Sequence, residues 1–172
     1  MSCRGQTVCF KTYNVHKRCI KNINGKILKV HSQGRLEPVA YFHSYPSPQS
    51  ETDHDGIDFS LVLYKKLLNI QMPAGIPIVF EITVNGSVYH MYCTEEENRK
   101  VLKFKEGSAP RKVQENMKNL IFFLQDFDDI YYKFESAWAL GWFLGTETDG
   151  TFTLKEVQAR DDETIAVSLN EV

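Results

Sequence analysis

The sequence lacks the features that mark membrane, nucleic-acid-binding and disulfide-rich proteins. No apolar run in its 172 residues approaches the roughly 20 residues that a helix needs to span a bilayer. The net charge is -2, whereas nucleic-acid-binding domains are strongly basic. A chain that is 42% hydrophobic and 24% charged has the composition of an ordinary globular protein, and its length suits one domain with a substantial core.

Cysteine is scarce, and its spacing excludes the common cysteine-based sites. Cys3, Cys9, Cys19 and Cys93 form no C-x-x-C pair and have no H-x-x-x-H partner, which argues against a zinc site. Four cysteines in a chain of this length are not a disulfide scaffold. We therefore expect free thiols, with Cys3 the most readily oxidised, and neither a metal nor an organic cofactor.

Catalytic motifs are also missing. The sequence contains no P-loop, no G-x-S-x-G and no H-E-x-x-H. Acidic clusters at 95–97, 126–129 and 161–163 adjoin turn residues, which favours solvated loops over the dry pocket that a catalytic carboxylate pair needs. The five histidines show no metal-ligand spacing: His16, His31, His43, His54 and His90. An enzyme is thus the function class that the sequence favours least.

The N-terminal stretch MSCRGQTVCFKTYNVHKR has no apolar core of the kind that secretory signal peptides carry. The sequence therefore predicts that the protein stays in the cytosol, leaves the cell by another route, or has lost a leader. We expect residues 1–8 to be a short N-terminal segment and residues 9–172 to form a single domain.

Short apolar segments with a period of two dominate the rest of the chain and predict an all-β fold. Only Arg111–Asn119 resembles a helix, and residues 46–56 and 67–75 are predicted to be loops. The twelve predicted strands are Val8–Tyr13, Arg18–Ile23, Lys26–His31, Phe59–Tyr64, Ile76–Val84, Val88–Cys93, Val101–Lys105, Leu120–Leu124, Tyr131–Glu135, Trp142–Thr146, Thr151–Glu156 and Ile165–Leu169.

Three hairpin dipeptides divide the chain at nearly equal intervals: Asn24-Gly25, Asn85-Gly86 and Asp149-Gly150. Such pairs suit type I′ turns, in which both central residues need positive φ. Twelve strands in three groups of four predict a β-trefoil, a six-stranded barrel capped by three hairpins. Closure would remove the exposed edges of a flat sheet. A β-sandwich is the alternative.

The segment 134–146, FESAWALGWFLGT, combines large apolar side chains with a single acid. We expect it to be a corner between two strands, with its aromatic rings buried and Gly141 supplying unusual backbone angles. The segment also resembles the interleukin-1 superfamily signature, aromatic-x-Ser-small-x-x-Pro-x-x-aromatic-Leu/Ile-small-Thr. It departs from that signature at Leu140 and Gly145. The matching residues are Phe134, Ser136, Ala137, Phe143, Leu144 and Thr146.

Further segments resemble the interleukin-18 branch of this superfamily and keep its order over roughly residues 9–172. They are 20–30 with 33–36, 59–65, 102–106, 119–123, 134–136 with 141–144, and 167–171. Interleukin-18 also lacks the proline of the signature. The rival branch contains the interleukin-36 proteins and the receptor antagonists, because Cys9-Phe10-Lys11 is similar to its opening strand.

The resemblance implies a β-trefoil cytokine without enzymatic activity, made without a signal peptide and released unconventionally. It implies that the ligand, as a monomer, bridges a primary and an accessory receptor chain to start immune signalling, with a soluble binding protein as a further partner. It also implies a propeptide cut after an aspartate, yet no aspartate lies in residues 1–8. We expect a mature form with a start Met or a protein without that control.

The same resemblance suggests receptor-contacting residues. Tyr64 and Lys65 match a Tyr-Lys strand end in interleukin-18, with Lys66 next to them. Arg35 corresponds to the arginine of a Gly-x-Arg pattern, but follows Gly34 directly, one residue closer than in that pattern. Location alone adds His16, Lys17, Lys21, Lys103 and Lys105. Two other classes stay open: a heparin- or carbohydrate-binding trefoil, and an intracellular trefoil with a cytoskeletal or nuclear partner.

Overall fold

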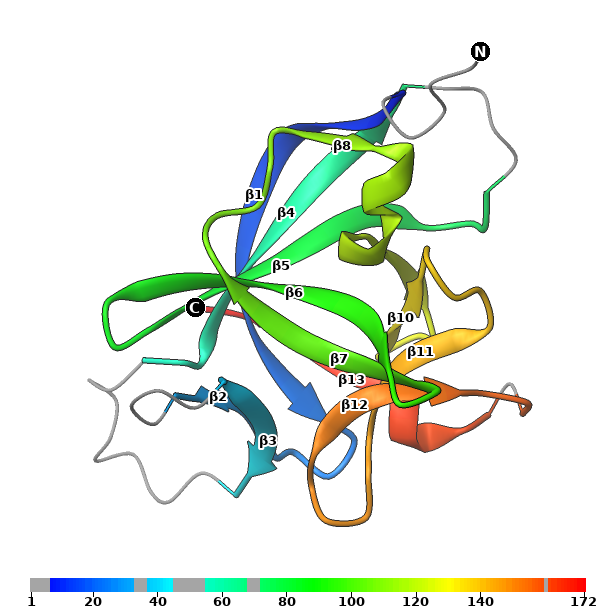
Figure 1. Ribbon diagram of the computed structural model, residues 1–172. Helices are drawn as coiled ribbons and strands as arrows, with labels where there is room; N and C mark the ends of the chain where they lie inside the picture. Colours follow the sequence, from blue (N-terminus) through cyan, green and yellow to red (C-terminus); the bar gives the residue numbers. More distant parts are fainter. Residues whose placement is uncertain (1–6, 33–36, 45–54, 68–71, 160) are drawn as a thin grey trace.

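The structure is a computed structural model that describes residues 7–32, 37–44, 55–67, 72–159 and 161–172 (Figure 1). Thirteen strands and two short 3-10 helices lie in these ranges. Among the described residues, no helix combines the length and the apolar character required for a membrane span. The fold is all-β, as predicted.

Six strands close into a barrel. Each pairs antiparallel with the next, in the order β1-β4-β5-β9-β10-β13, and β13 pairs back onto β1. A β-sandwich has no such closed circuit of pairing, so that alternative is excluded. The barrel strands are β1 (Val8–Asn22), β4 (Asp58–Lys66), β5 (Ile76–Val84), β9 (Phe122–Asp126), β10 (Tyr132–Ser136) and β13 (Val167–Glu171).

Three hairpins complete the fold, which confirms the β-trefoil. They are β2 (Ile27–His31) with β3 (Val39–His43), β6 (Ser87–Glu96) with β7 (Arg99–Glu106), and β11 (Trp142–Thr146) with β12 (Phe152–Glu156). One further short strand, β8 (Lys112–Gln114), pairs with β1 and leads into the helix η3 (Glu115–Leu120). The helix η4 (Glu163–Ile165) precedes β13.

Two hydrophobic clusters hold the fold, and β4 contributes to both because its alternate side chains point to opposite faces. Leu61 and Leu63 join the larger cluster inside the barrel. Val62 and Tyr64 join the smaller one, together with buried residues of β1, β8 and η3. Both faces of β4 are therefore covered over most of its length, and only its last two residues are exposed.

The predicted strands differ from the structure at two places whose effects on the count cancel. Val8–Tyr13 and Arg18–Ile23 are parts of one strand, β1, which continues through a polar, exposed stretch and contains a bulge between Thr12 and Asn14. The strand β3 was not predicted. Its five residues alternate in burial, but they lie between polar segments and give a weak pattern. The twelve trefoil strands are thus correct in number, but not all in place.

The predicted helix Arg111–Asn119 is wrong in its first half. Residues 112–114 form β8, because the buried Val113 pairs with Phe10 of β1 and joins the smaller cluster. The rest is the 3-10 helix η3, in which Leu120 is the buried residue and Met117 has a non-helical φ of -113°. Tertiary pairing here overrides a local sequence that favours a helix.

The hairpin dipeptides were predicted correctly as turns, but they are not equivalent. Asn85 and Gly86 both have positive φ, 51° and 80°, as a type I′ turn requires. In the other two pairs only the glycine does. Asn24-Gly25 and Asn85-Gly86 join a barrel strand to a hairpin strand, whereas Asp149-Gly150 lies inside the β11–β12 hairpin. Their equal spacing therefore did not reflect equivalent positions in the three trefoil units.

Candidate functional site

The segment 134–146 is a structural corner, as predicted, but of its aromatic rings only Phe134 is fully buried, and Trp138 is 37% exposed. The buried Ser136 ends β10, and its Oγ accepts hydrogen bonds from the backbone amides of Trp138 and Ala139 at 3.2 and 3.1 Å. Glu135, the acid of the segment, accepts from the amide of Gly141 at 2.8 Å. Gly141 has φ of +85°. The polar side chains thus satisfy the backbone of the turn.

Replacing Ser136 by alanine is expected to lower the free energy of unfolding by about 1–2 kcal/mol. The change leaves two turn amides without their acceptor, as in the loss of a helix cap. Urea denaturation followed by tryptophan fluorescence would measure it. Ser168→Ala is the control, because Ser168 lies on β13 and is only half-buried, so a change below about 0.5 kcal/mol is expected. Equal losses in the two variants would contradict this role of Ser136.

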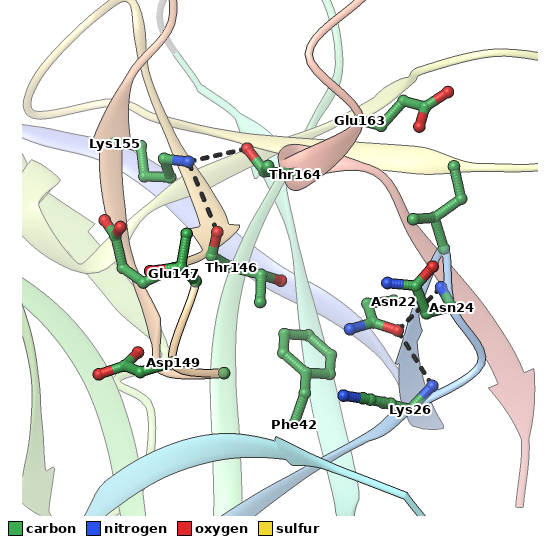
Figure 2. A pocket seen from close by; sticks show the side chains of 13 residues that line it. Asn22, Asn24, Lys26, Phe42, Thr146, Glu147, Asp149, Lys155, Glu163 and Thr164 are labelled. Atoms are coloured by element: carbon green, nitrogen blue, oxygen red, sulfur yellow. Dashed lines mark hydrogen bonds between the residues drawn. The ribbon is translucent and has the colours of Figure 1, made fainter.

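A surface pocket of about 470 Å³ lies between the turn after β1, the β11–β12 hairpin and η4 (Figure 2). On one side Lys155 donates to the carbonyl of Thr146 and, at 2.9 Å, to the hydroxyl of Thr164. That hydroxyl donates to Asp162 at 2.6 Å. On the other side Asn22 accepts from two backbone amides of its own turn. These polar groups form hydrogen bonds with one another and with the surrounding turns, and thereby stabilise the local structure.

The described cysteines are free thiols, as predicted, and Cys3 lies outside the described residues. Burial, together with a smaller effect of the hydrogen bond to Glu115, raises the pKa of Cys9 to about 11. Burial likewise raises the pKa of Cys93 to about 12, against a smaller opposing effect of Ser136. Because the thiolate is the reactive form, both thiols are unreactive at neutral pH.

The most distinctive exposed surface lies where the middle of β1 passes β4. We call it the β1–β4 surface and define it by Lys11, Tyr13, Val15, Lys17 and Lys65. Tyr13 and Val15 are 48% and 50% exposed although both are large and apolar. Lys11 lies opposite Lys65 in the strand pairing, and the Lys65 ammonium lies 5.6 Å from the centroid of the Tyr13 ring. Apolar and cationic groups therefore alternate over this surface.

The position of this surface follows from a gap in the pairing of β1. On the side away from β4, the β8 pairing ends at Lys11 and the β13 pairing begins at Arg18. The Thr12 amide still donates to the carbonyl of Arg111, and in the described part of the chain no strand pairs with residues 13–17 on that side. The Asn14 side-chain oxygen accepts from the exposed backbone amide of Val15 at 2.8 Å, so this amide is already satisfied and is less available to pair with another strand. What the surface offers to a partner is therefore mainly its side chains.

Part of the predicted receptor-contacting set lies on or beside this surface. Lys17 and Lys65 belong to it, and the half-buried His16 lies between them in the β1–β4 pairing, within 3.2 Å of the Asn14 amide nitrogen. Lys66 is exposed at the end of β4, with its ammonium 5.5 Å from the centroid of the Phe123 ring.

Tyr64 lies in the core instead of on the surface. It is 1% exposed, and its hydroxyl donates to the carbonyl of Pro110 at 2.5 Å. Burial raises its pKa well above the ordinary tyrosine value. The strand-end motif therefore places Lys65 outside and Tyr64 inside, because neighbouring side chains of a strand point to opposite faces.

The remaining predicted residues lie elsewhere. Lys21 is half-buried near the end of β1, where that strand pairs with β2 and β13. Lys103 on β7 forms ion pairs with Glu37 and Glu96, which raise its pKa, while the neighbouring Lys105 is exposed. Arg35 lies outside the described residues. The structure thus does not gather the predicted set into one patch.

Tyr13 and Val15 were missed as surface residues because Val8–Tyr13 was predicted to end before the polar stretch. If residues 8–22 had been predicted as one strand, the period of two would have placed Tyr13, Val15 and Lys17 on the same face of it. The bulge at Tyr13, however, shifts the β1–β4 register at this point, and no sequence pattern predicts it.

Comparison with known proteins agrees with the fold. The family model "Interleukin-1 / 18" matches residues 55–167. Chicken (Gallus gallus) interleukin-18 is 29% identical over 152 residues, which are 85% of this chain and 74% of that protein. Among solved structures, chicken interleukin-1 beta matches with a TM-score of 0.69 and 18% identity, covering 94% of this chain and 99% of that one.

The solution structure of interleukin-36alpha matches with a TM-score of 0.60 and 17% identity, covering 93% of this chain and 96% of that one. At these identities the two structural matches show the fold alone. The family model covers well over half of the chain and includes the corner at 134–146. The chain therefore belongs to the interleukin-1/18 family and is a β-trefoil cytokine similar to interleukin-18.

Proposed function

We propose that this protein is a secreted pro-inflammatory cytokine of the interleukin-18 type that acts without enzymatic activity. As a monomer it binds a primary receptor ectodomain and then recruits an accessory receptor. We further propose that residues 9–172 act as one trefoil domain and that release follows an unconventional route. The observation that carries the proposal is the β1–β4 surface on a fold of this family.

The chemistry of the β1–β4 surface suits a protein partner. Aromatic side chains that bury well form the energetic centre of many interfaces, and Tyr13 is half-exposed beside the equally exposed Val15. Exposed Lys11 and Lys17 flank this apolar pair along β1, and the Lys65 ammonium lies 5.6 Å from the Tyr13 ring centroid. Long-range attraction between such lysines and an acidic receptor surface would speed association. We therefore place the primary receptor on this surface.

The test is binding to the purified interleukin-18 primary receptor ectodomain, with and without the accessory ectodomain, by surface plasmon resonance. Binding that tightens when the accessory chain is added supports an agonist. Binding without tightening indicates a receptor antagonist, the alternative function within the superfamily. Failure to bind either ectodomain overturns the interleukin-18 assignment and directs the same assay to the interleukin-36 receptor.

Replacing Lys65 by glutamate is expected to weaken primary-receptor binding at least about tenfold, mainly through a lower association rate. The side chain is exposed at a strand end, so the thermal midpoint of unfolding should stay unchanged. Lys133→Glu is a matched control, because Lys133 also lies above an aromatic ring, Phe143, but on β10. Wild-type binding by Lys65→Glu would remove Lys65 from the interface.

A further inference from the structure

The β2–β3 hairpin has an outer face that the proposed receptor contact does not use. Four residues of the hairpin, Leu28, Val30, Ala40 and Phe42, are buried in the larger cluster. The intervening side chains are more exposed, because successive residues of a strand point to opposite faces. These residues are Ile27, Lys29, His31, Val39, Tyr41 and His43.

Two of these outer side chains meet. The Nε2 atoms of His31 and His43 lie 2.8 Å apart, with ring centroids at 4.8 Å and ring planes at 68°. The Tyr41 ring lies between them in sequence, with its centroid 6.2 Å from that of His31 and 6.3 Å from that of His43. Two imidazole nitrogens approach this closely only when at least one carries a lone pair towards the other.

The surroundings of His31 favour its neutral imidazole form. Partial burial lowers the pKa of His31, and the nearby His43 and Lys29 lower it further. Neutral imidazole is the form that ligates metal ions. Both rings come from paired strands of one hairpin, so their backbones are already held in place before any ligand arrives.

We propose that His31 and His43 together bind a divalent first-row transition-metal ion through their Nε2 atoms, with water in the remaining coordination positions. Two ligand nitrogens at about 2.0 Å from an ion and at right angles to each other are about 2.8 Å apart, which fits the tetragonal geometry of Cu²⁺ and Ni²⁺. Tetrahedral zinc would need about 3.3 Å. Because the two Nε2 atoms lie within hydrogen-bond distance of each other, binding requires each ring to turn its lone pair towards the ion.

The described part of the chain supplies no third ligand, since no group of three or more His, Cys, Asp and Glu residues there is arranged to hold a metal. The affinity should therefore be modest. Lys29 lies on the same outer face and already lowers the pKa of His31, so its positive charge also opposes a bound cation. Removing that charge is expected to tighten binding.

The experiment is calorimetric titration of the full chain with Ni²⁺ at pH 7.5, an ion chosen because it does not oxidise the free thiols. One ion should bind per chain. His31→Ala and His43→Ala should each weaken binding at least about tenfold, whereas His16→Ala, on β1, should leave it unchanged. Lys29→Gln should strengthen it. Near-UV circular dichroism and the thermal midpoint would verify that each variant folds.

Absence of Ni²⁺ binding by the wild-type chain would overturn the proposal. So would equal binding by the wild type and both His31→Ala and His43→Ala, because the ion would then sit elsewhere, for example on a thiol. Binding that weakens as the pH is lowered would support it, because protonation removes the lone pair with which imidazole binds a metal ion.

Discussion

Replacing Phe80 by alanine is expected to lower the free energy of unfolding by about 3–5 kcal/mol. Phe80 on β5 is fully buried, and its ring meets those of Phe134, Phe122 and Phe59 at centroid distances of 4.8, 5.7 and 6.4 Å. All three contacts are edge-on, the arrangement that aromatic quadrupoles favour. These rings come from four barrel strands, so the cavity would open in the centre of the barrel.

Urea denaturation would measure the loss. It would be a large part of the total, because the free energy of unfolding of a globular domain is only about 5–15 kcal/mol. Ile130→Ala is the control, because Ile130 is 71% exposed and its truncation should change the free energy of unfolding by less than about 0.5 kcal/mol. A loss below about 1 kcal/mol for Phe80→Ala would mean that the barrel centre collapses around the gap or is loosely packed.

Most of the barrel could be predicted from the sequence, because its strands either alternate between apolar and polar residues or are apolar throughout. The bounds of Ile76–Val84 and Trp142–Thr146 agree with β5 and β11. Asn85-Gly86 predicted its turn because both residues tolerate positive φ. The turn between β6 and β7 was invisible, since Glu97 and Asn98 adopt φ of 50° and 64° without a glycine. The pairing of β6 with β7 fixes that turn, and such pairing cannot be predicted from the residues of the turn alone.

The site was harder to predict than the fold, for two physical reasons. Burial at a strand end depends on what covers each face, so Tyr64 and Lys65 could not be told apart without knowing that β8 and η3 cover one side of β4. Whether two side chains of a hairpin meet depends on how strongly its strands coil, as well as on their spacing in the sequence. His31 and His43 are not direct partners in the β2–β3 register, yet their rings meet.

Replacing Gly56 by alanine is expected to lower the free energy of unfolding by about 3 kcal/mol or more, whereas Gly25→Ala should lower it by only about 1 kcal/mol. The two glycines have nearly the same backbone angle, φ of +74° and +76°. An added Cβ at Gly25 meets nothing within 4 Å. At Gly56 it would overlap the carbonyl oxygen of Val30.

The overlap at Gly56 cannot relax cheaply, because both sides of the contact are backbone. The Gly56 carbonyl accepts from the amide of Val30 at 2.8 Å, and its amide donates to Thr83 at 3.1 Å. Gly56 thereby ties β2 of the first hairpin to β5 of the barrel, and the neighbouring Asp55 accepts from the Asn85 amide at 2.9 Å. Parallel urea titrations of both variants separate steric overlap from backbone strain, since only the overlap differs. Similar losses would mean that the chain around Val30 yields, and that this link between the hairpin and the barrel is weaker than its hydrogen bonds suggest.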